Sequence, residues 1–222
     1  MERFFHEELQ GLKGKVLEMG ALAAQAISQS IQALLERDET LAKEVLDREK
    51  EINRLEIEID EEGHGDIALG QPLAGDLRLV TSILKINTDL ERMGDHAVNI
   101  AERVRGMSRE PRLERYLGIP EMAQAAIEML EDALDSFRKE DPALARSVLE
   151  RDDVVDRYND ELYAEAEKIA SRNSAVARSG MNLILIGHNL ERIADLATNI
   201  AENVIYLKEG KEVRHRLEDT GS

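Results

Sequence analysis

Two acidic segments contain the residues best placed to do chemistry. DLERMGDHAVNIAE and NLERIADLATNIAE lie 100 positions apart, agree at nine of fourteen places, and each contain a Glu-x-x-x-Asp pair. The pairs are Glu91 with Asp95 and Glu191 with Asp195. Carboxylates one helical turn apart lie on the same side of a helix, and oxygen ligands of this kind suit a divalent or trivalent cation.

The helical periodicity places these acids away from the core. At about 100° per residue, Asp95 lies roughly 40° from Glu91, Glu102 roughly 20° and Asn99 roughly 80°. The apolar side chains of the same segment gather on the opposite side, and they are Ile83, Ile86, Leu90, Met93, Ala97, Ile100 and Val104. The pattern therefore predicts an exposed or groove-lining acidic ridge, repeated in the second segment by Glu191, Asp195, Asn199 and Glu202.

A single helix rarely completes a metal shell, so a second helix is expected to contribute ligands. The segment ERDDVVDRYND supplies Asp152 and Asp156, and the matching places of the first half hold Glu49 and Asn53. A solvated face remains the alternative, with Arg92 pairing with Asp95 and Arg192 with Asp195, because like charges at i,i+4 cost only a few tenths of a kcal/mol.

The whole chain shows an internal duplication. A second pair of matching blocks, RDETLAKEVLDRE from Arg37 and EDPALARSVLERD from Glu140, occurs at an offset of 103. Two blocks in the same order at nearly the same offset indicate a repeat of about 100 residues.

Helix-start and helix-breaking signals divide each half into three helices. Asp38 and Asp141 are candidate N-caps, Asp76 is a third, and GHGDIALGQPLAGD interrupts the first half. The predicted helices are 3–36, 39–68, 76–107, 120–139, 142–171 and 175–209. We therefore expect an all-α protein of two tandem three-helix bundles, with domains 1–108 and 120–222 joined by a linker at 109–119.

Composition limits the partners. A formal charge of −17 argues against binding nucleic acid, and the absence of cysteine excludes disulfides and thiolate metal sites. The longest apolar stretch, MNLILIG, is far too short to cross a bilayer, and the amphipathic N-terminus lacks the apolar core of a signal peptide. We expect a soluble, cytoplasmic protein that does not insert into the membrane.

The segments QPLAGDLRLV, LERMGDHAVNIAE, LERIADLATNIAE, VLDREKEINRLE and VLERDDVVDRYND resemble the PhoU family of bacterial regulators of phosphate transport and phosphate signalling. The resemblance runs from about Phe4 to Tyr206 and includes the duplication. It implies two three-helix bundles and a non-catalytic adaptor between the ATPase subunit of the phosphate ABC transporter and a phosphate-sensing histidine kinase. Such an adaptor restrains the phosphate regulon when phosphate is plentiful. Members of the family often form homodimers.

The resemblance also implies multinuclear iron or zinc clusters on the paired acidic motifs. In this chain those motifs fall on Glu49, Asn53, Glu91, Asp95, Asp152, Asp156, Glu191 and Asp195. Asn53 stands where the family has a carboxylate, so the first-half cluster is expected to be the weaker one.

Two rival classes share these features. A di-iron carboxylate protein would need Glu-x-x-His pairs facing a bundle core, and the pairs with that spacing are Glu61–His64 and Glu212–His215. The first lies among glycines and the second in the C-terminal tail, which argues against that class. A metal-free helical scaffold is the other alternative. His96 has Leu196 as its counterpart, which favours an interhelix or surface role over metal ligation.

Overall fold

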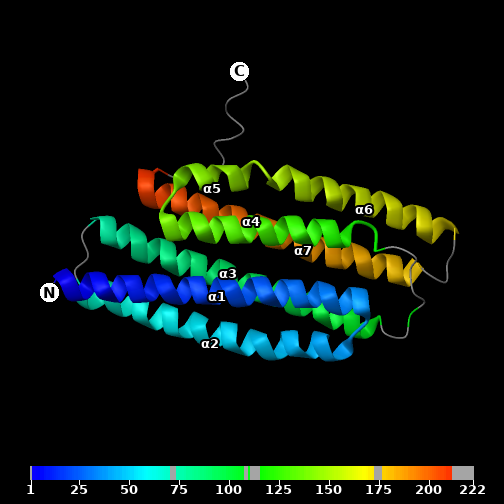
Figure 1. The fold of residues 1–222 in the computed structure, drawn as a ribbon, viewed down its shortest axis with the longest axis horizontal. Coiled ribbons are helices and arrows are strands. Elements are labelled where there is room, and N and C mark those ends of the chain that lie inside the picture. Colours follow the sequence, from blue (N-terminus) through cyan, green and yellow to red (C-terminus); the bar gives the residue numbers. More distant parts are fainter. Residues whose placement is uncertain (1, 71–73, 108–109, 111–115, 173–176, 212–222) are drawn as a thin grey trace, which may run out of the picture.

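Long antiparallel helices make up nearly all of the protein. A computed structural model describes residues 2–70, 74–107, 110, 116–172 and 177–211. The helices are α1 (Glu2–Glu36), α2 (Glu39–Gly70), α3 (Ala74–Gly106), α4 (Ile119–Lys139), α5 (Pro142–Leu149), α6 (Asp152–Arg172) and α7 (Ala177–Glu209). Helices α1 to α3 form one bundle and α4 to α7 form a second one beside it (Figure 1). No strand occurs in the described ranges, so the predicted all-α fold with two tandem bundles is confirmed.

Side-chain caps begin the middle helix of each bundle. The Asp38 carboxylate accepts hydrogen bonds from the backbone N–H groups of Thr40 and Leu41, at 2.7 and 3.2 Å. Asp141 caps α5 in the same way, through Ala143 and Leu144 at 2.9 and 3.2 Å. The two predicted caps are thus equivalent in the two halves.

Asp76 is not the cap that the sequence predicted. Helix α3 begins at Ala74, so Asp76 lies inside its first turn. A carboxylate there is still favourable, because the N-terminal end of a helix carries partial positive charge.

The glycines near the end of the predicted helix 39–68 do not shorten α2. The helix continues through Gly63 and Gly65 and ends at Gly70, two residues beyond the predicted end. A Cβ atom at Gly63 would lie 2.8 Å from Leu84 Cδ2 of α3. Gly63 therefore permits the close approach of α2 and α3, and that packing offsets the roughly 1 kcal/mol of helix propensity that glycine lacks.

The middle helix of the second half is broken, whereas the sequence predicted one helix over 142–171. Helix α5 ends at Leu149 and α6 starts at Asp152, with a turn at Glu150 and Arg151 between them. Arg151 reaches across this turn to the Asp132 carboxylate of α4, and its Nε donates to the Ser147 carbonyl at 3.3 Å. The break places Asp152 at the start of a helix, while the matching Glu49 lies within unbroken α2.

The two halves share one core. Helices α3 and α7 contact each other as extensively as they contact helices of their own bundles, and α1 also contacts α4. The buried apolar side chains of both halves form a single continuous cluster. At the contact between α1 and α4, a Cβ atom on Gly20 would lie 2.5 Å from Leu134 Cδ1. The division into domains 1–108 and 120–222 stays a prediction.

Candidate functional site

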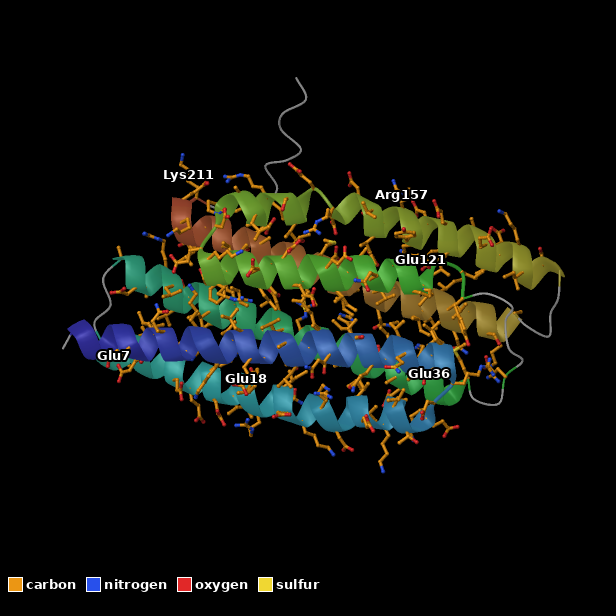
Figure 2. All side chains as sticks on the ribbon, viewed as in Figure 1. Glu7, Glu18, Glu36, Glu121, Arg157 and Lys211 are labelled. Atoms are coloured by element: carbon orange, nitrogen blue, oxygen red, sulfur yellow. The ribbon has the colours of Figure 1, made fainter. Side chains whose placement is uncertain are left out.

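Four carboxylates of the second half gather on one face, formed by α6 and α7. We call Asp152, Asp156, Glu191 and Asp195 the second ridge. Desolvation, followed by repulsion from Asp156 and Asp195, raises the pKa of Asp152 to about 6. Burial and the neighbouring Asp195 also raise the pKa of Asp156. The carboxylates of the two helices are therefore close enough to interact electrostatically. Arg157, beside Asp156, is exposed and points away from α6 (Figure 2).

Two members of the second ridge are paired with basic neighbours on α7. Asp195 Oδ2 accepts a hydrogen bond from Arg192 Nη1 at 2.5 Å, which confirms the Arg192–Asp195 pair considered from the sequence. His188 Nδ1 lies 2.9 Å from Glu191 Oε2. In contrast, Asp152 Oδ1 is buried and has no hydrogen-bond partner. The α6 side of the ridge thus keeps a desolvated, unsatisfied acceptor.

The first half has a corresponding ridge on α2 and α3. We call Glu49, Asn53, Glu91 and Asp95 the first ridge. Asn53 Nδ2 donates to Glu49 Oε1 at 2.9 Å, while Asn53 Oδ1 is buried without a partner. Burial, then repulsion from Asp95 and from acids of α2, raises the pKa of Glu91. Both ridges therefore span two helices, as predicted, and each contains one unsatisfied buried oxygen.

Comparison with known proteins decides the family. The PhoU domain family model matches residues 16–104 and again residues 119–204. The chain belongs to the PhoU family. The repeated match coincides with the duplication that the sequence shows.

Several full-length relatives agree with this assignment. A phosphate-specific transport system accessory protein PhoU homolog from Aquifex aeolicus is 40% identical over 95% of both chains. The corresponding Pseudomonas aeruginosa protein is 38% identical over 95% of this chain and 88% of its own length. The crystal structure of PhoU from Pseudomonas aeruginosa superposes with a TM-score of 0.90, at 36% identity over 93% of this chain and 100% of that one. The phosphate transport system regulatory protein PhoU from Streptococcus pneumoniae gives a TM-score of 0.82 at 30% identity, over 94% and 99% of the two chains.

The donor chemistry of the ridges in this PhoU chain fits a cation, although the ligands are not assembled around one. Carboxylate and amide oxygens suit hard or borderline metal ions, and buried unsatisfied oxygens such as Asp152 Oδ1 and Asn53 Oδ1 lack a positive partner. Among the described residues, no group of three or more His, Asp or Glu side chains is arranged to hold a metal ion. Arg192 and His188 occupy Asp195 Oδ2 and Glu191 Oε2, so metal binding through these two oxygens would displace those contacts. Metal ligation by the eight predicted residues stays a prediction.

The raised pKa of Asp152 predicts a pH-dependent stability effect. Because the folded-state pKa of about 6 exceeds the ordinary value of 3.8, the folded protein resists ionising this group, and the cost is present above about pH 6. In chelator-treated protein, Asp152→Asn is expected to raise the free energy of unfolding by about 1 kcal/mol near pH 7.5, allowing for half-exposure of the carboxylate. The gain should shrink as the pH falls from about 6 and vanish only below 3.8, where the wild-type carboxyl is protonated in both states.

Urea unfolding near neutral pH and near pH 4 would check this effect. Asp153→Asn is the matched control, because Asp153 is the exposed neighbour of Asp152. An equal gain from Asp152→Asn at both pH values would show that something other than carboxylate ionisation is responsible.

His96 and Gly94 serve contacts between helices in this PhoU chain. His96 Nδ1 lies 2.9 Å from Asn189 Oδ1, which joins α3 to α7 and confirms the interhelix role. Desolvation lowers the pKa of His96. A Cβ atom on Gly94 would lie 3.2 Å from Ile52 Cδ1, so this position is small because α2 approaches it closely.

The candidate pair Glu61–His64 does not form a buried metal site. Glu61 and His64 are both exposed on α2, and His64 Nδ1 lies 2.8 Å from the Asp60 carbonyl oxygen. Glu212 and His215 lie outside the described residues.

Glu110 is a contact that the sequence did not reveal. It lies in the predicted linker, and its carboxylate accepts hydrogen bonds from Ser179 Oγ at 3.0 Å and Asn182 Nδ2 at 3.2 Å, both on α7. Its carbonyl oxygen accepts from Arg37 Nη1, at the end of α1, at 2.8 Å. Through Glu110, the linker therefore contacts α1 of the first half and α7 of the second. An isolated acid in a Pro- and Gly-containing segment carries no periodic signal that would have identified it.

Proposed function

We propose that this protein is a non-catalytic regulator of phosphate uptake and phosphate-responsive signalling. The observation that carries the proposal is its likeness, over 95% of both chains, to a phosphate-specific transport system accessory protein PhoU homolog. A solved PhoU structure superposes over 93% of the chain, so the likeness extends to the arrangement of the helices.

The proposed mode of action is that of a cytoplasmic adaptor. It binds the ATPase subunit of the phosphate ABC transporter and a phosphate-sensing histidine kinase, and it holds the regulon in its repressed state when phosphate is plentiful. Within the described part of the chain, no helix is both long and apolar enough to cross a membrane. Contact with membrane proteins would then use their cytoplasmic domains. Homodimerisation is part of the same proposal.

We further propose that the second ridge holds a surface iron or zinc cluster through Asp152, Asp156, Glu191 and Asp195. Bound cations would supply positive charge between α6 and α7, where burial and mutual repulsion now raise the pKa of Asp152, Asp156 and Asp195. Glu49, Glu91 and Asp95, with the neutral Asn53, offer a weaker site in the first half. The Arg192–Asp195 and His188–Glu191 pairs favour the competing metal-free scaffold.

Gene deletion tests the regulatory proposal. In high phosphate, deletion should derepress phosphate-regulated transcription and raise phosphate uptake, and the intact gene should restore both. Purified protein should capture the transporter ATPase or the kinase from phosphate-replete cells. Unchanged transcription and uptake in the deletion strain, together with failure to capture either protein, would contradict the adaptor role.

A further inference from the structure

An apolar groove lies between α6 and α7. Figure 1 shows the part of the molecule concerned, where α6 ends and α7 begins. The groove has a volume of about 600 Å³, and Tyr163 of α6 and Met181 of α7 form part of its lining. The side chains of these two residues are 46% and 63% exposed. Ala166 and Gly180 are small, buried residues at its floor. Large exposed apolar side chains beside a small-residue floor are typical of a surface that receives another side chain.

The first half of the duplication has polar residues where the groove has its apolar walls. Position 60, which corresponds to Tyr163 at the offset of 103, is Asp60. Position 81, which corresponds to Met181 at the offset of 100, is Thr81. The same fold is thus built in the first half without exposed apolar side chains at these two places. Packing of the bundle does not require Tyr163 and Met181 to be apolar.

The floor also differs between the halves. The position equivalent to Gly180 at the offset of 100 is Val80, whose side chain is fully buried in the first half. In the second half a Cβ atom on Gly180 would meet only the carbonyl oxygen and Cβ of Ala166, at 3.9 and 4.0 Å. A valine side chain thus occupies, in the first half, the position that glycine leaves without a side chain in the second.

The charged residues that line the groove in the described part of the chain are acidic. Asp160 and Glu167 line it, and among the described residues neither has an ion-pair partner. Of the described basic side chains nearby, Lys168 lies 4.0 Å from Glu165 and Arg178 lies 3.7 Å from Glu110. Another acidic surface would be repelled from these two carboxylates. Charge complementarity instead favours a basic occupant.

We propose that the α6–α7 groove binds a basic amphipathic helix of a partner protein, with apolar side chains entering between Tyr163 and Met181 and basic side chains facing Asp160 and Glu167. Helices recognised in this way present apolar residues one turn apart, and methionine adapts well to such ligands. The inference rests on the proposed adaptor function, which it deepens by naming a binding surface and the chemistry of the partner.

A synthetic peptide tests the groove independently of any natural partner. The probe is a fluorescein-labelled Leu/Lys peptide of about four helical turns, and its acidic counterpart has Glu in place of every Lys. Fluorescence anisotropy is measured with full-length wild-type protein, with the double variant Tyr163→Asp/Met181→Thr, and with Ile57→Asp. The double variant places at positions 163 and 181 the residue types found at the equivalent first-half positions, Asp60 and Thr81. Ile57→Asp removes an apolar side chain of similar exposure, 55%, from α2.

The double variant is expected to bind the Leu/Lys peptide at least about tenfold more weakly than wild type, whereas Ile57→Asp should stay within about twofold. The Leu/Glu peptide should not bind, and salt should weaken the Leu/Lys complex. Equal binding by wild type and the double variant, or equal binding of the two peptides, overturns the proposal. A fall in molecular mass of the double variant by light scattering also overturns it, since the occupant would then be a second copy.

Capture of the transporter ATPase and the kinase separates this inference from the proposed function. The double variant, folded by circular dichroism, should lose capture of one of these proteins, and Ile57→Asp should retain it. If the double variant captures both at the wild-type level, the groove assignment is wrong while the adaptor function stands. If wild type captures neither, the adaptor function fails, and the peptide measurement alone decides whether the groove binds a basic helix.

Discussion

Phe137→Ala is expected to lower the free energy of unfolding by about 3 to 5 kcal/mol, because it removes a fully buried aromatic ring and leaves a cavity. Phe137 lies near the end of α4, where α1 of the other half approaches. Lys13 Nζ of α1 lies 5.3 Å from the centroid of its ring. Lys13 also pairs with Glu140 at 3.0 Å, and Glu140 pairs with Lys208 of α7 at 2.8 Å. The substitution thus weakens the shared core at a contact between the halves.

Urea unfolding followed by circular dichroism would measure this loss. Phe137→Leu is the matched control and should cost less, because it retains most of the apolar volume. Since the buried cluster is continuous across both halves, we expect wild type and variant to unfold in one cooperative transition. Two separate transitions in Phe137→Ala, with only the first shifted, would show that residues 1–108 and 120–222 unfold as independent domains.

Metal titration of chelator-treated protein is expected to show two classes of site, with the tighter class in the second half. The second ridge has four carboxylates, whereas Asn53 leaves the first ridge with three, and ligand charge is a main determinant of cation affinity. Asp195→Ala should weaken the tighter class by at least about tenfold, since it removes a direct ligand. Asp95→Ala should affect only the weaker class. Calorimetric titration with iron(II) under anaerobic conditions, zinc or manganese gives both stoichiometry and affinity.

Two substitutions in the opposite direction provide the controls. Asn53→Asp supplies the missing carboxylate and should bring the first site close to the affinity of the second. Arg192→Gln releases Asp195 from its 2.5 Å hydrogen bond and should tighten the second site. If none of these four variants changes stoichiometry or affinity, the repeated Glu-x-x-x-Asp motif is a solvated face and the metal-free scaffold is correct.

The sequence alone was sufficient for features that depend on local periodicity and local hydrogen bonding. The duplication, the helical segments apart from the break at Glu150 and Arg151, and the caps at Asp38 and Asp141 follow from the spacing of apolar residues and from side chains two or three positions from the backbone groups they bind. The acidic ridges were predicted for the same reason, because one face of a helix is set by its own residues.

Only the tertiary structure decided features that depend on residues distant in the chain. Leu84 of α3 packs against Gly63 of α2, and the helix break before Asp152 is bridged by an Arg151–Asp132 ion pair to α4. The pairing of Glu110 with α7 and the sharing of one core by both halves also arise from contacts of this kind. The accessible groove in the second half belongs to the same class. Its lining residues lie on two helices, and the residue pattern of a single helix does not predict how much space separates it from the other.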